Sequence, residues 1–196
     1  MQAAAEVFST AGFHASTFKE IARRAGVSER GLAYHFHTKE ALLEAVMSDH
    51  HHRRSAVVLA ATGLGAFAAV LAVVEADAEM PDVVNLQSIL GGEATAQDHP
   101  AHDHYRHRYA DLRMYLARAF AAALDDGEAT SELGANDLAA GFIALLDGLQ
   151  MQWLFDRDAV RVGKTVDGFL ATVLSPDAMS EVRRLREEFL ENSDSA

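Results

Sequence analysis

The apolar positions of residues 17–26 recur at i, i+3, i+4 and i+7, which is the spacing of a helix with one apolar face. They are Phe18, Ile21, Ala22 and Ala25. Thr17, with Glu20 three residues later, fits a capping box at the start of this helix. Gly26 can adopt the left-handed backbone that ends it. The pattern therefore predicts a short amphipathic helix with a defined beginning and end.

A second short helix is predicted directly after a tight turn at residues 26–28. Ser28 can cap it, and Leu32 and Phe36 point back at the first helix. Two helices joined in this way form a helix-turn-helix. A helix pair with a glycine turn is also common in helical proteins that bind no DNA. The solvent-facing positions are donors and a ring, which suit the major groove of DNA; they are Glu29, Arg30, Gly31, Tyr34 and His35.

The flanking segments favour DNA binding over an ordinary helix pair. Upstream, residues 4–11 carry another apolar stripe, which is broken at Gly12. Downstream, Thr38 can cap a further helix. The inner face of that helix carries Leu42, Leu43 and Val46. Together these segments make a compact head with a core of its own.

Residues 1–47 resemble the DNA-binding head of the tetracycline-repressor (TetR) family of bacterial transcription regulators. The matching stretches are Ala-Ala-Glu-Val-Phe-Ser-Thr-Ala-Gly-Phe (4–13), Ser-Thr-Phe-Lys-Glu-Ile-Ala-Arg-Arg-Ala-Gly-Val-Ser (16–28) and Tyr-His-Phe-His-Thr-Lys-Glu-Ala-Leu-Leu (34–43). Two positions depart from the family pattern. The chain opens at Met1, already within the first helix, where the family has further and often basic residues. Ala33 stands where the family often places a phosphate-contacting Tyr, with Tyr34 next to it.

The resemblance implies an all-α fold, with a three-helix helix-turn-helix head at residues 1–48 and a larger helical ligand-binding and dimerisation domain at 49–196. It implies a cytoplasmic homodimer, not an enzyme, that represses transcription from a palindromic DNA operator and is released by a small-molecule effector. Repression and activation stay open alternatives. The residues expected to hold phosphates are Thr17, Lys19, Ser28 and Lys39. Those expected at the bases or the nearby backbone are Arg30, Gly31, Tyr34 and His35.

The net charge of −12 is unusual for a DNA-binding protein until it is divided along the chain. Residues 1–55 carry seven Lys and Arg against six Asp and Glu, so the excess of negative charge belongs to residues 56–196. Phosphate attraction is local, because salt screens charges beyond about 8 Å. A nearly neutral head can therefore bind DNA while the acidic remainder discourages unspecific adhesion. We expect binding to be modest and dependent on salt.

The rest of the chain predicts further helices near 81–92, 100–126, 136–155 and 162–174, with a last amphipathic helix after Pro176. Residues 55–74 carry no charge, which is long enough for a membrane span, but the segment is rich in Ala. A single helix buried in a bundle is therefore the preferred interpretation. The helices near 136–155 and 162–174 are the expected dimer interface, since both are apolar on more than one side. Gly141, Ala144 and Gly148 give the first a shallow face, although both helices can also be wholly internal.

An apolar effector pocket is expected among the helices that begin near 56, 81, 100 and 136. Arg113, if it points inward, favours an anionic or carbonyl-bearing effector. For each apolar residue the alternative is ordinary core. The candidate wall residues are Phe67, Leu71, Leu86, Leu90, Tyr109, Arg113, Phe142, Leu146 and Trp153.

Histidines are dense near the start of the helix at residue 100, and imidazoles with carboxylates can bind zinc or a similar cation. The candidates are His99, His102, His104 and His107. A metal-binding sensor or hydrolase built on them is the alternative to a repressor, although we expect no metal and no cofactor. A carrier with a vestigial head is a third possibility. The histidines at 50–52 are expected to form a solvated helix end. The chain has no cysteine and none of the spacings of a phosphate loop or a nucleophile elbow, so catalysis has little support.

Overall fold

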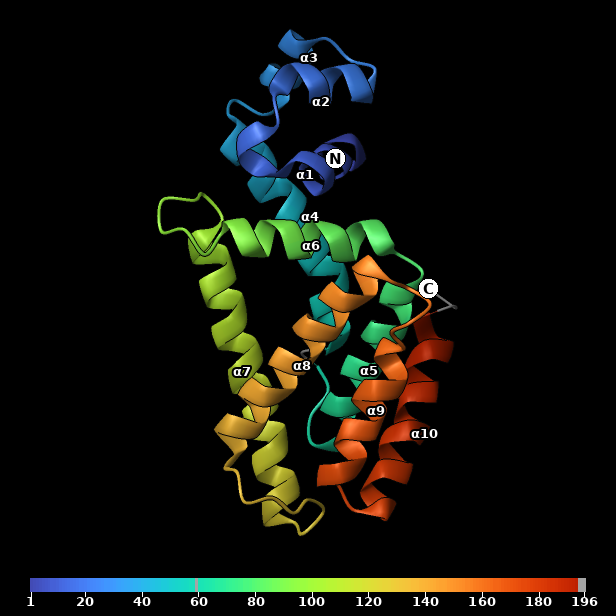
Figure 1. Ribbon diagram of the computed structural model, residues 1–196. Coiled ribbons are helices and arrows are strands. Elements are labelled where there is room, and N and C mark those ends of the chain that lie inside the picture. The colour runs from blue at the N-terminus through green and yellow to red at the C-terminus, as the bar shows by residue number, and fades with distance from the viewer. Residues whose placement is uncertain (59, 194–196) are drawn as a thin grey trace. The chain divides into compact units, whose positions relative to one another are not determined.

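The computed structural model describes the backbone of residues 1–58 and 60–193, and the side chains of residues 1–48 and 60–191. This part of the chain is helical and contains no strand, apart from one isolated bridge between Ala129 and Leu174. The described residues form ten helices, which confirm the predicted all-α class. Figure 1 shows how they follow one another along the chain. They are α1 (Gln2–Ala15), α2 (Phe18–Ala25), α3 (Glu29–His35), α4 (Lys39–Val58), α5 (Leu64–Ala78), α6 (Pro81–Glu93), α7 (His102–Asp125), α8 (Ala135–Phe155), α9 (Val162–Val173) and α10 (Pro176–Ser193).

The chain divides into two compact units. The first contains residues 1–53 and 80–107, and the second contains residues 54–79 and 108–196. The first unit thus adds α6 and the beginning of α7 to the predicted head. The functional boundary after residue 48 stays a prediction.

Local sequence signals define the ends of α2, α3 and α4 in the first unit. Thr17, Ser28 and Thr38 each accept the backbone N–H from three residues further on, at 3.2, 3.0 and 3.1 Å. Gly26 ends α2 in the left-handed region (φ 69°, ψ 24°). These predicted caps are confirmed, but Glu20 does not complete the capping box, because its carboxylate binds Arg23 instead.

The helix α6 packs along α1 within the first unit. Asn85 Nδ2 donates to the carbonyl of Ser9 at 2.7 Å, and Glu93 Oε2 accepts the backbone N–H of Phe13 at 2.7 Å. Gly12 forms a kink in α1 with φ 72° and ψ 179°, and a Cβ at this position would lie 2.2 Å from Glu93 Oε1. The absence of a side chain at residue 12 therefore lets the Glu93 carboxylate reach the backbone.

The second unit is built around α5, against which α10 and α9 pack, while α8 packs on α9. Its core contains three aromatic rings from different helices, since the Phe67 centroid lies 4.7 Å from that of Phe120 and 6.5 Å from that of Phe142. All three side chains are fully buried. Burial of such rings away from water supplies much of the stability of a helical bundle.

Two predictions about helix boundaries are wrong. Residues 55–74 do not form one helix, because α4 ends at Val58 and α5 begins at Leu64 after Gly63, whose φ is 54°. The glycine breaks the helix where hydrophobicity alone gave no signal. The sequence predicts that Asn136 caps the helix near 136–155, but the N-cap of α8 is Gly134, so Asn136 lies inside the first turn.

Among the described residues one helix, α8, is long and apolar enough to cross a membrane by length and composition. Only 39% of its most apolar stretch is buried in the chain. Core helices of soluble proteins meet the same criterion, so this is weak evidence for a span. It does mean that much of an apolar helix faces outward.

We predict that Gly12→Ala lowers the free energy of unfolding by about 2 kcal/mol or more, because alanine is strained at this φ and ψ and its Cβ displaces Glu93. Urea unfolding of the purified protein measures the change. Gly92→Ala is the matched control, since its Cβ would enter open space within α6. Because alanine has a higher helix propensity than glycine, Gly92→Ala should be at least as stable as the parent protein. Equal destabilisation of both variants would contradict the role given to Gly12.

Candidate nucleic-acid interface and effector site

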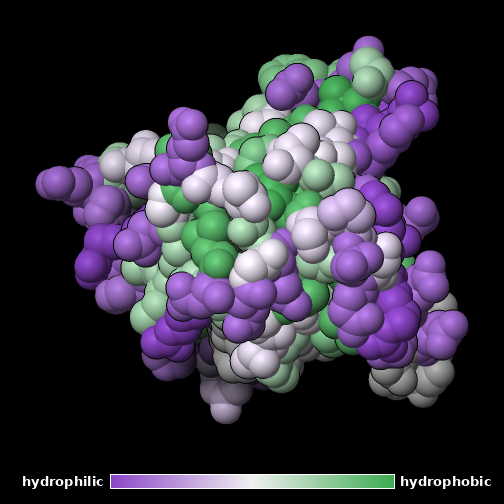
Figure 2. Space-filling model, turned by 90° about the horizontal axis from the view of Figure 1, so that it is seen from below, coloured by the Kyte–Doolittle hydropathy of each residue, from purple (hydrophilic) through white to green (hydrophobic). Residues whose placement is uncertain are grey.

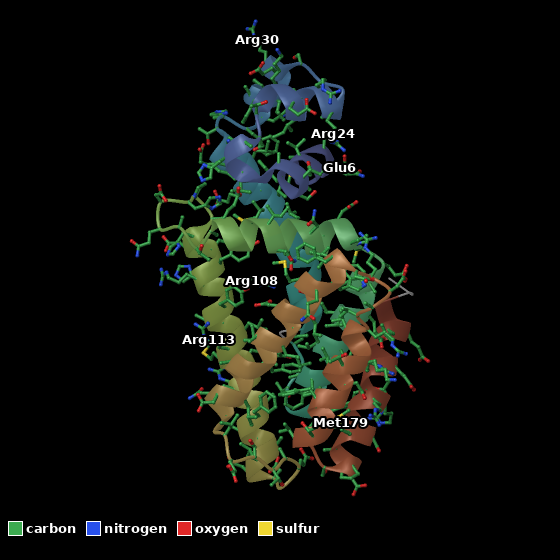
Figure 3. All side chains as sticks on the ribbon, in the orientation of Figure 1. Glu6, Arg24, Arg30, Arg108, Arg113 and Met179 are labelled. Carbon is green, nitrogen blue, oxygen red and sulfur yellow. The ribbon has the colours of Figure 1, made fainter. Side chains whose placement is uncertain are left out.

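The exposed face of α3 carries the side chains that were predicted to meet DNA. Leu32 is buried and anchors the helix, whereas Arg30, Tyr34 and His35 are exposed. Tyr34 keeps 79% of its surface accessible, and its ring meets that of His35 edge to face at 5.4 Å. In Figure 3 the Arg30 side chain extends outward from α3. A large exposed ring beside a free guanidinium contributes nothing to the core, so this face is available to a partner.

Gly31 lies on the same helix, next to its cap. A Cβ on residue 31 would lie 3.1 Å from Ser28 Oγ, which already accepts the Gly31 N–H at 3.0 Å. A larger residue would therefore press on the cap that begins α3. The position favours glycine for local reasons as well as for close approach to DNA.

Two exposed hydroxyl groups stand at the starts of α2 and α3. Thr17 Oγ1 and Ser28 Oγ each accept one backbone N–H as a cap. A hydroxyl that accepts in this way still has its own proton to donate. Both residues can therefore keep their structural role and donate to a phosphate oxygen at the same time.

Carboxylates neutralise two of the arginines in the head. Arg23 binds Glu20 through two N–H···O contacts of 2.8 and 2.6 Å, and Arg24 Nε lies 2.7 Å from Glu6 Oε2. The pKa of Glu20 is lowered mainly by its hydrogen bonds with Arg23. Figure 3 shows Arg24 beside Glu6 and well apart from Arg30. The arginines of α2 are thus already paired.

Lys39 has a structural role that its sequence position did not indicate. Its ammonium donates to the carbonyls of Phe13 at 2.7 Å, Ser16 at 3.0 Å and His14 at 3.4 Å. It also lies 4.2 Å from the centroid of the Phe13 ring. An ammonium has three donors, and all three are engaged here. In this conformation Lys39 has no donor left for the phosphate contact predicted for it.

Among the described residues, Lys19 and Arg30 form no ion pair, and both are exposed. They are therefore the cations of the head that remain available for phosphates. Since few positive charges of the described head are unpaired, we expect its attraction to a DNA backbone to be small.

In the second unit a polar group joins α7 to α8. The Tyr109 hydroxyl donates to Asp147 Oδ2 at 2.8 Å, and the guanidinium of Arg108 lies 5.6 Å from the Tyr109 ring centroid. Desolvation by surrounding atoms raises the pKa of Asp147, and it raises the pKa of Tyr109 to about 12. Both side chains nevertheless keep access to solvent. They are thus partly covered by protein and partly open to solvent, an arrangement that suits recognition of a small molecule. The sequence had indicated Tyr109 but neither Arg108 nor Asp147.

The other predicted effector residues lie in both units. Leu86 and Leu90 are buried in the first unit. In the second, Phe67, Leu71, Phe142 and Leu146 belong to the hydrophobic core, and Trp153 is buried as well. Arg113 is exposed, whereas Arg108, five residues earlier, lies against Tyr109. An effector role for these residues stays a prediction.

The histidines near residue 100 do not come together. His99 is buried, while His102 Nδ1 lies 2.8 Å from the carbonyl of Ala94. His104 packs edge-on against Tyr105, and His107 Nε2 lies 3.2 Å from Arg106. Among the residues with described side chains, no three His, Cys, Asp or Glu side chains form a group able to hold a metal. The metal-binding alternative therefore has no geometric support here. The histidines at 50–52 lie outside the described side chains.

Small and apolar residues face outward on α8 and α9. Met151 and Phe155 are exposed on α8, Phe155 to 86%, and added Cβ atoms on Gly141 and Gly148 would meet nothing within 4 Å. The exposed positions of α9 include Gly168, Ala171 and Thr172. We call these residues of α8 and α9 the outer face. Figure 2, which views one side of the molecule, also shows apolar side chains reaching the surface among hydrophilic ones.

Comparisons with known proteins agree with this geometry. Residues 1–46 match the bacterial regulatory proteins of the tetR family, and residues 65–175 match the C-terminal domain of BetI-type transcriptional repressors. The second match covers more than half of the chain. The chain belongs to the TetR family of transcriptional regulators.

The TetR-family assignment is supported by individual relatives. Residues of the head are 47% identical over 47 residues to the HTH-type transcriptional regulator RutR of Escherichia coli K12, and the same identity holds for RutR of Shigella flexneri. These matches span 24% of this chain and 22% of the relatives, so they concern the head alone.

Solved structures share the fold over most of the TetR-family chain. A TetR-family regulator from Rhodococcus sp. has a TM-score of 0.65 at 24% identity, and a transcriptional regulator from Saccharomonospora viridis in complex with choline has 0.71 at 22%. Each comparison covers 89% of this chain and 95% of the other. A gamma-butyrolactone receptor (ArpA-like protein) has 0.67 at 18% identity, covering 97% and 93%. At such identities the likeness shows the fold and leaves the ligand open.

We predict that Arg30→Ala weakens binding to a cognate duplex by about tenfold and lowers the slope of log affinity against log salt by about 1, because one unpaired positive charge is lost. Arg24→Ala should change that slope little, since Glu6 already neutralises Arg24. Fluorescence anisotropy over a series of salt concentrations measures both. A larger effect from Arg24→Ala than from Arg30→Ala would show that the paired arginine, rather than α3, holds the DNA.

Proposed function

We propose that this TetR-family protein is a homodimeric repressor that binds a palindromic operator and is released by a small-molecule effector. The observation that carries the proposal is the exposed face of α3, where Arg30, Tyr34 and His35 have no part in the core of the head. Arg30 and His35 can donate to base edges or the nearby backbone, and Tyr34 offers a ring and a hydroxyl. Thr17, Lys19 and Ser28 would hold phosphates and fix the register. Lys39 would act indirectly, by holding the end of α1.

The outer face of α8 and α9 supports the homodimer. Gly141, Gly148 and Gly168 leave open space where a Cβ would stand, so a helix of a second copy can approach closely. Met151 and Phe155 would be removed from water in the same contact. Two helices from each subunit would then form a four-helix interface. A two-fold dimer also provides two α3 helices about one DNA turn (~34 Å) apart, which a single head cannot do.

The polar group of Arg108, Tyr109 and Asp147 supports an effector with a cationic group. Asp147 is partly desolvated, which raises its pKa, so a cation placed beside it would stabilise its charged form. The Tyr109 ring offers a face for the same cation. Choline, the ligand in one structural relative, has such a group. A lactone, which another relative's name indicates, would instead need a donor such as Arg108.

Release follows from linkage between the two sites. An effector that prefers a conformation with wrongly spaced heads lowers DNA affinity by the same preference. A preference of about 100-fold, or about 2.7 kcal/mol, is enough to empty a moderately bound operator. We propose that the change reaches the head through a tilt of α4. Lys39, at the start of α4, holds the carbonyl end of α1 and would transmit the movement.

Selection of bound sequences from random duplex DNA tests the class of function. We predict a palindromic consensus for the parent protein. Gly148→Leu should disrupt the dimer by filling the open face of α8, and it should reduce operator affinity by at least tenfold. Ala110→Leu, at an exposed position of α7, is the control for surface hydrophobicity. Sedimentation measures the dimer. A consensus without two-fold symmetry, or full affinity in a monomeric variant, would contradict the proposal.

Effector recognition is tested with choline and a gamma-butyrolactone as probes. We predict that choline binds the parent protein and lowers its operator affinity, and that Asp147→Asn weakens choline binding at least tenfold, because one charge of the pair is lost. Isothermal titration calorimetry measures this. Asp137→Asn, an exposed carboxylate on the same helix, should leave choline binding unchanged. Binding of the lactone alone, or of choline with equal affinity in both variants, would exclude a cation site at Asp147.

A further inference from the structure

The backbone of Phe13 is held from two helices. Its N–H donates to Glu93 Oε2 on α6 at 2.7 Å, and its carbonyl accepts from Lys39 Nζ on α4 at 2.7 Å. Phe13 lies at the end of α1, directly after the Gly12 kink. We call these contacts of Phe13 with Glu93 and Lys39 the junction. A change in either one alters how the end of α1 is fixed within the first unit.

A buried histidine stands beside the junction. The side chain of His99 has no exposed surface, and its ring packs edge-on against the rings of Phe13 and His14, each at 5.3 Å. Its Nδ1 accepts the backbone N–H of Ala101 at 3.1 Å, which assigns the ring proton to Nε2. Nε2 is buried without a hydrogen-bond partner, and it lies 3.7 Å from Glu93 Oε2.

Glu93 Oε2 therefore lies close to two N–H groups, that of Phe13 and that of His99. Glu93 Oε2 accepts the Phe13 N–H, and the Nε2–H of neutral His99 stops short of hydrogen-bond distance from it. A positive charge on the imidazole would attract this oxygen strongly, because few waters can screen the pair in a buried site. The new proton would also stand on Nδ1 and face the Ala101 N–H, where donor meets donor. Protonation of His99 thus changes the contact of Nε2 with Glu93 and also the contact of Nδ1 with the Ala101 N–H.

The charged and titratable groups around His99 come from every element packed there. Glu93 belongs to α6, His14 to α1 and Asp98 to the segment between α6 and α7. Lys39 of α4 lies over the Phe13 ring, with its Nζ 4.2 Å from the ring centroid. Burial lowers the pKa of His99 first of all, His14 lowers it further, and Glu93 and Asp98 oppose the change. The balance keeps the ring neutral near pH 7.

We propose that His99 makes the junction sensitive to acid, so that protonation of its ring draws Glu93 away from the Phe13 N–H and loosens the end of α1. The α1 end packs with the rest of the DNA-binding head, so loosening it weakens operator binding. The device concerns the regulation of the proposed repressor, and it rests on that function only for its effect on DNA.

The direction of the pH effect follows from linkage. His99 has a lowered pKa in the closed junction and its ordinary value of about 6.5 once the junction opens. The open form therefore binds more protons, and acid favours it. The junction keeps its full strength above about pH 7 and loses strength as the pH falls below about 6.5. At pH 5.5 the loss is at most about tenfold in the closing equilibrium of each chain.

Two variants separate the charge from the hydrogen bonds. His99→Asn keeps an acceptor for the Ala101 N–H but cannot titrate. Glu93→Gln keeps an acceptor for the Phe13 N–H but loses the carboxylate charge, so it should lower the pKa of His99 further. His14→Asn replaces the exposed neighbouring ring and is the matched control.

The test uses the full-length protein between pH 7.5 and 5.5. NMR measures the titration of His99 and the hydrogen exchange of the Phe13 amide after correction for the intrinsic effect of pH. In the parent and in His14→Asn, protection of the Phe13 amide and affinity for the selected duplex should both fall by up to about tenfold. In His99→Asn both should stay level.

Several outcomes would overturn the acid-sensitive junction. They are an ordinary pKa for His99 in the folded protein, a pKa that does not fall in Glu93→Gln, or the same pH dependence in His99→Asn as in the parent. If His99→Asn fails to fold, the pKa of His99 measured in the parent and in Glu93→Gln still tests the proposal. Duplex binding at pH 7.5 does not depend on the acid-sensitive junction. If the parent and all variants failed to bind the duplex at pH 7.5, that result would instead contradict the proposed function.

Discussion

The backbone of Phe13 is the point on which the packing of the first unit depends. Phe13 is buried, so its N–H and its carbonyl both need partners, since an unpaired buried amide costs about 1–3 kcal/mol. The partners come from Glu93 and Lys39, which are far away in the sequence. Gly12 is the condition for this arrangement, because a side chain there would occupy the place of the Glu93 carboxylate. One small residue thus permits the Glu93 carboxylate to bind the backbone.

This arrangement also changes how the charge of the head is understood. Five cations precede residue 40, but Lys39 holds backbone carbonyls, and Arg23 and Arg24 are paired with Glu20 and Glu6. The positive charge of the head therefore stabilises the head itself to a large extent. Phosphate attraction alone is sequence-independent, so a head with few unpaired cations adheres weakly to random DNA. If α3 meets the bases as proposed, its contacts would account for a larger share of the binding free energy, which would favour specificity over affinity.

The sequence predicted features that are local. The caps at Thr17, Ser28 and Thr38 and the left-handed Gly26 were read correctly, because each depends on residues within four positions. The exposure of Arg30, Tyr34 and His35 followed from helical periodicity for the same reason.

Contacts between distant segments could not be predicted. The bond from Phe13 to Glu93 joins residues 80 positions apart, and that from Tyr109 to Asp147 joins residues 38 apart. No periodicity relates such pairs, so Glu93 and Asp147 carried no signal, and Lys39 was expected to hold a phosphate rather than the backbone of α1. The histidines near residue 100 were noticed for their density. Density alone could not indicate that His99 packs inward against Phe13, whereas His102 contacts the carbonyl of Ala94.

The hydropathy of α8 illustrates how composition and burial must be considered together. A helix this apolar is expected to be buried, yet less than half of its most apolar stretch is covered within one chain. Its exposed positions include small residues, such as Gly141 and Ala144, as well as the large apolar side chains of Met151 and Phe155. A lipid-facing helix gains nothing from glycine, whereas a helix that meets another closely gains contact area wherever a side chain is missing. The exposed glycines therefore favour a protein partner over lipid, and a second copy presents the same small residues at the same spacing. Closure of that symmetric contact would give each head a partner at a fixed distance, which is the constraint that a palindrome requires.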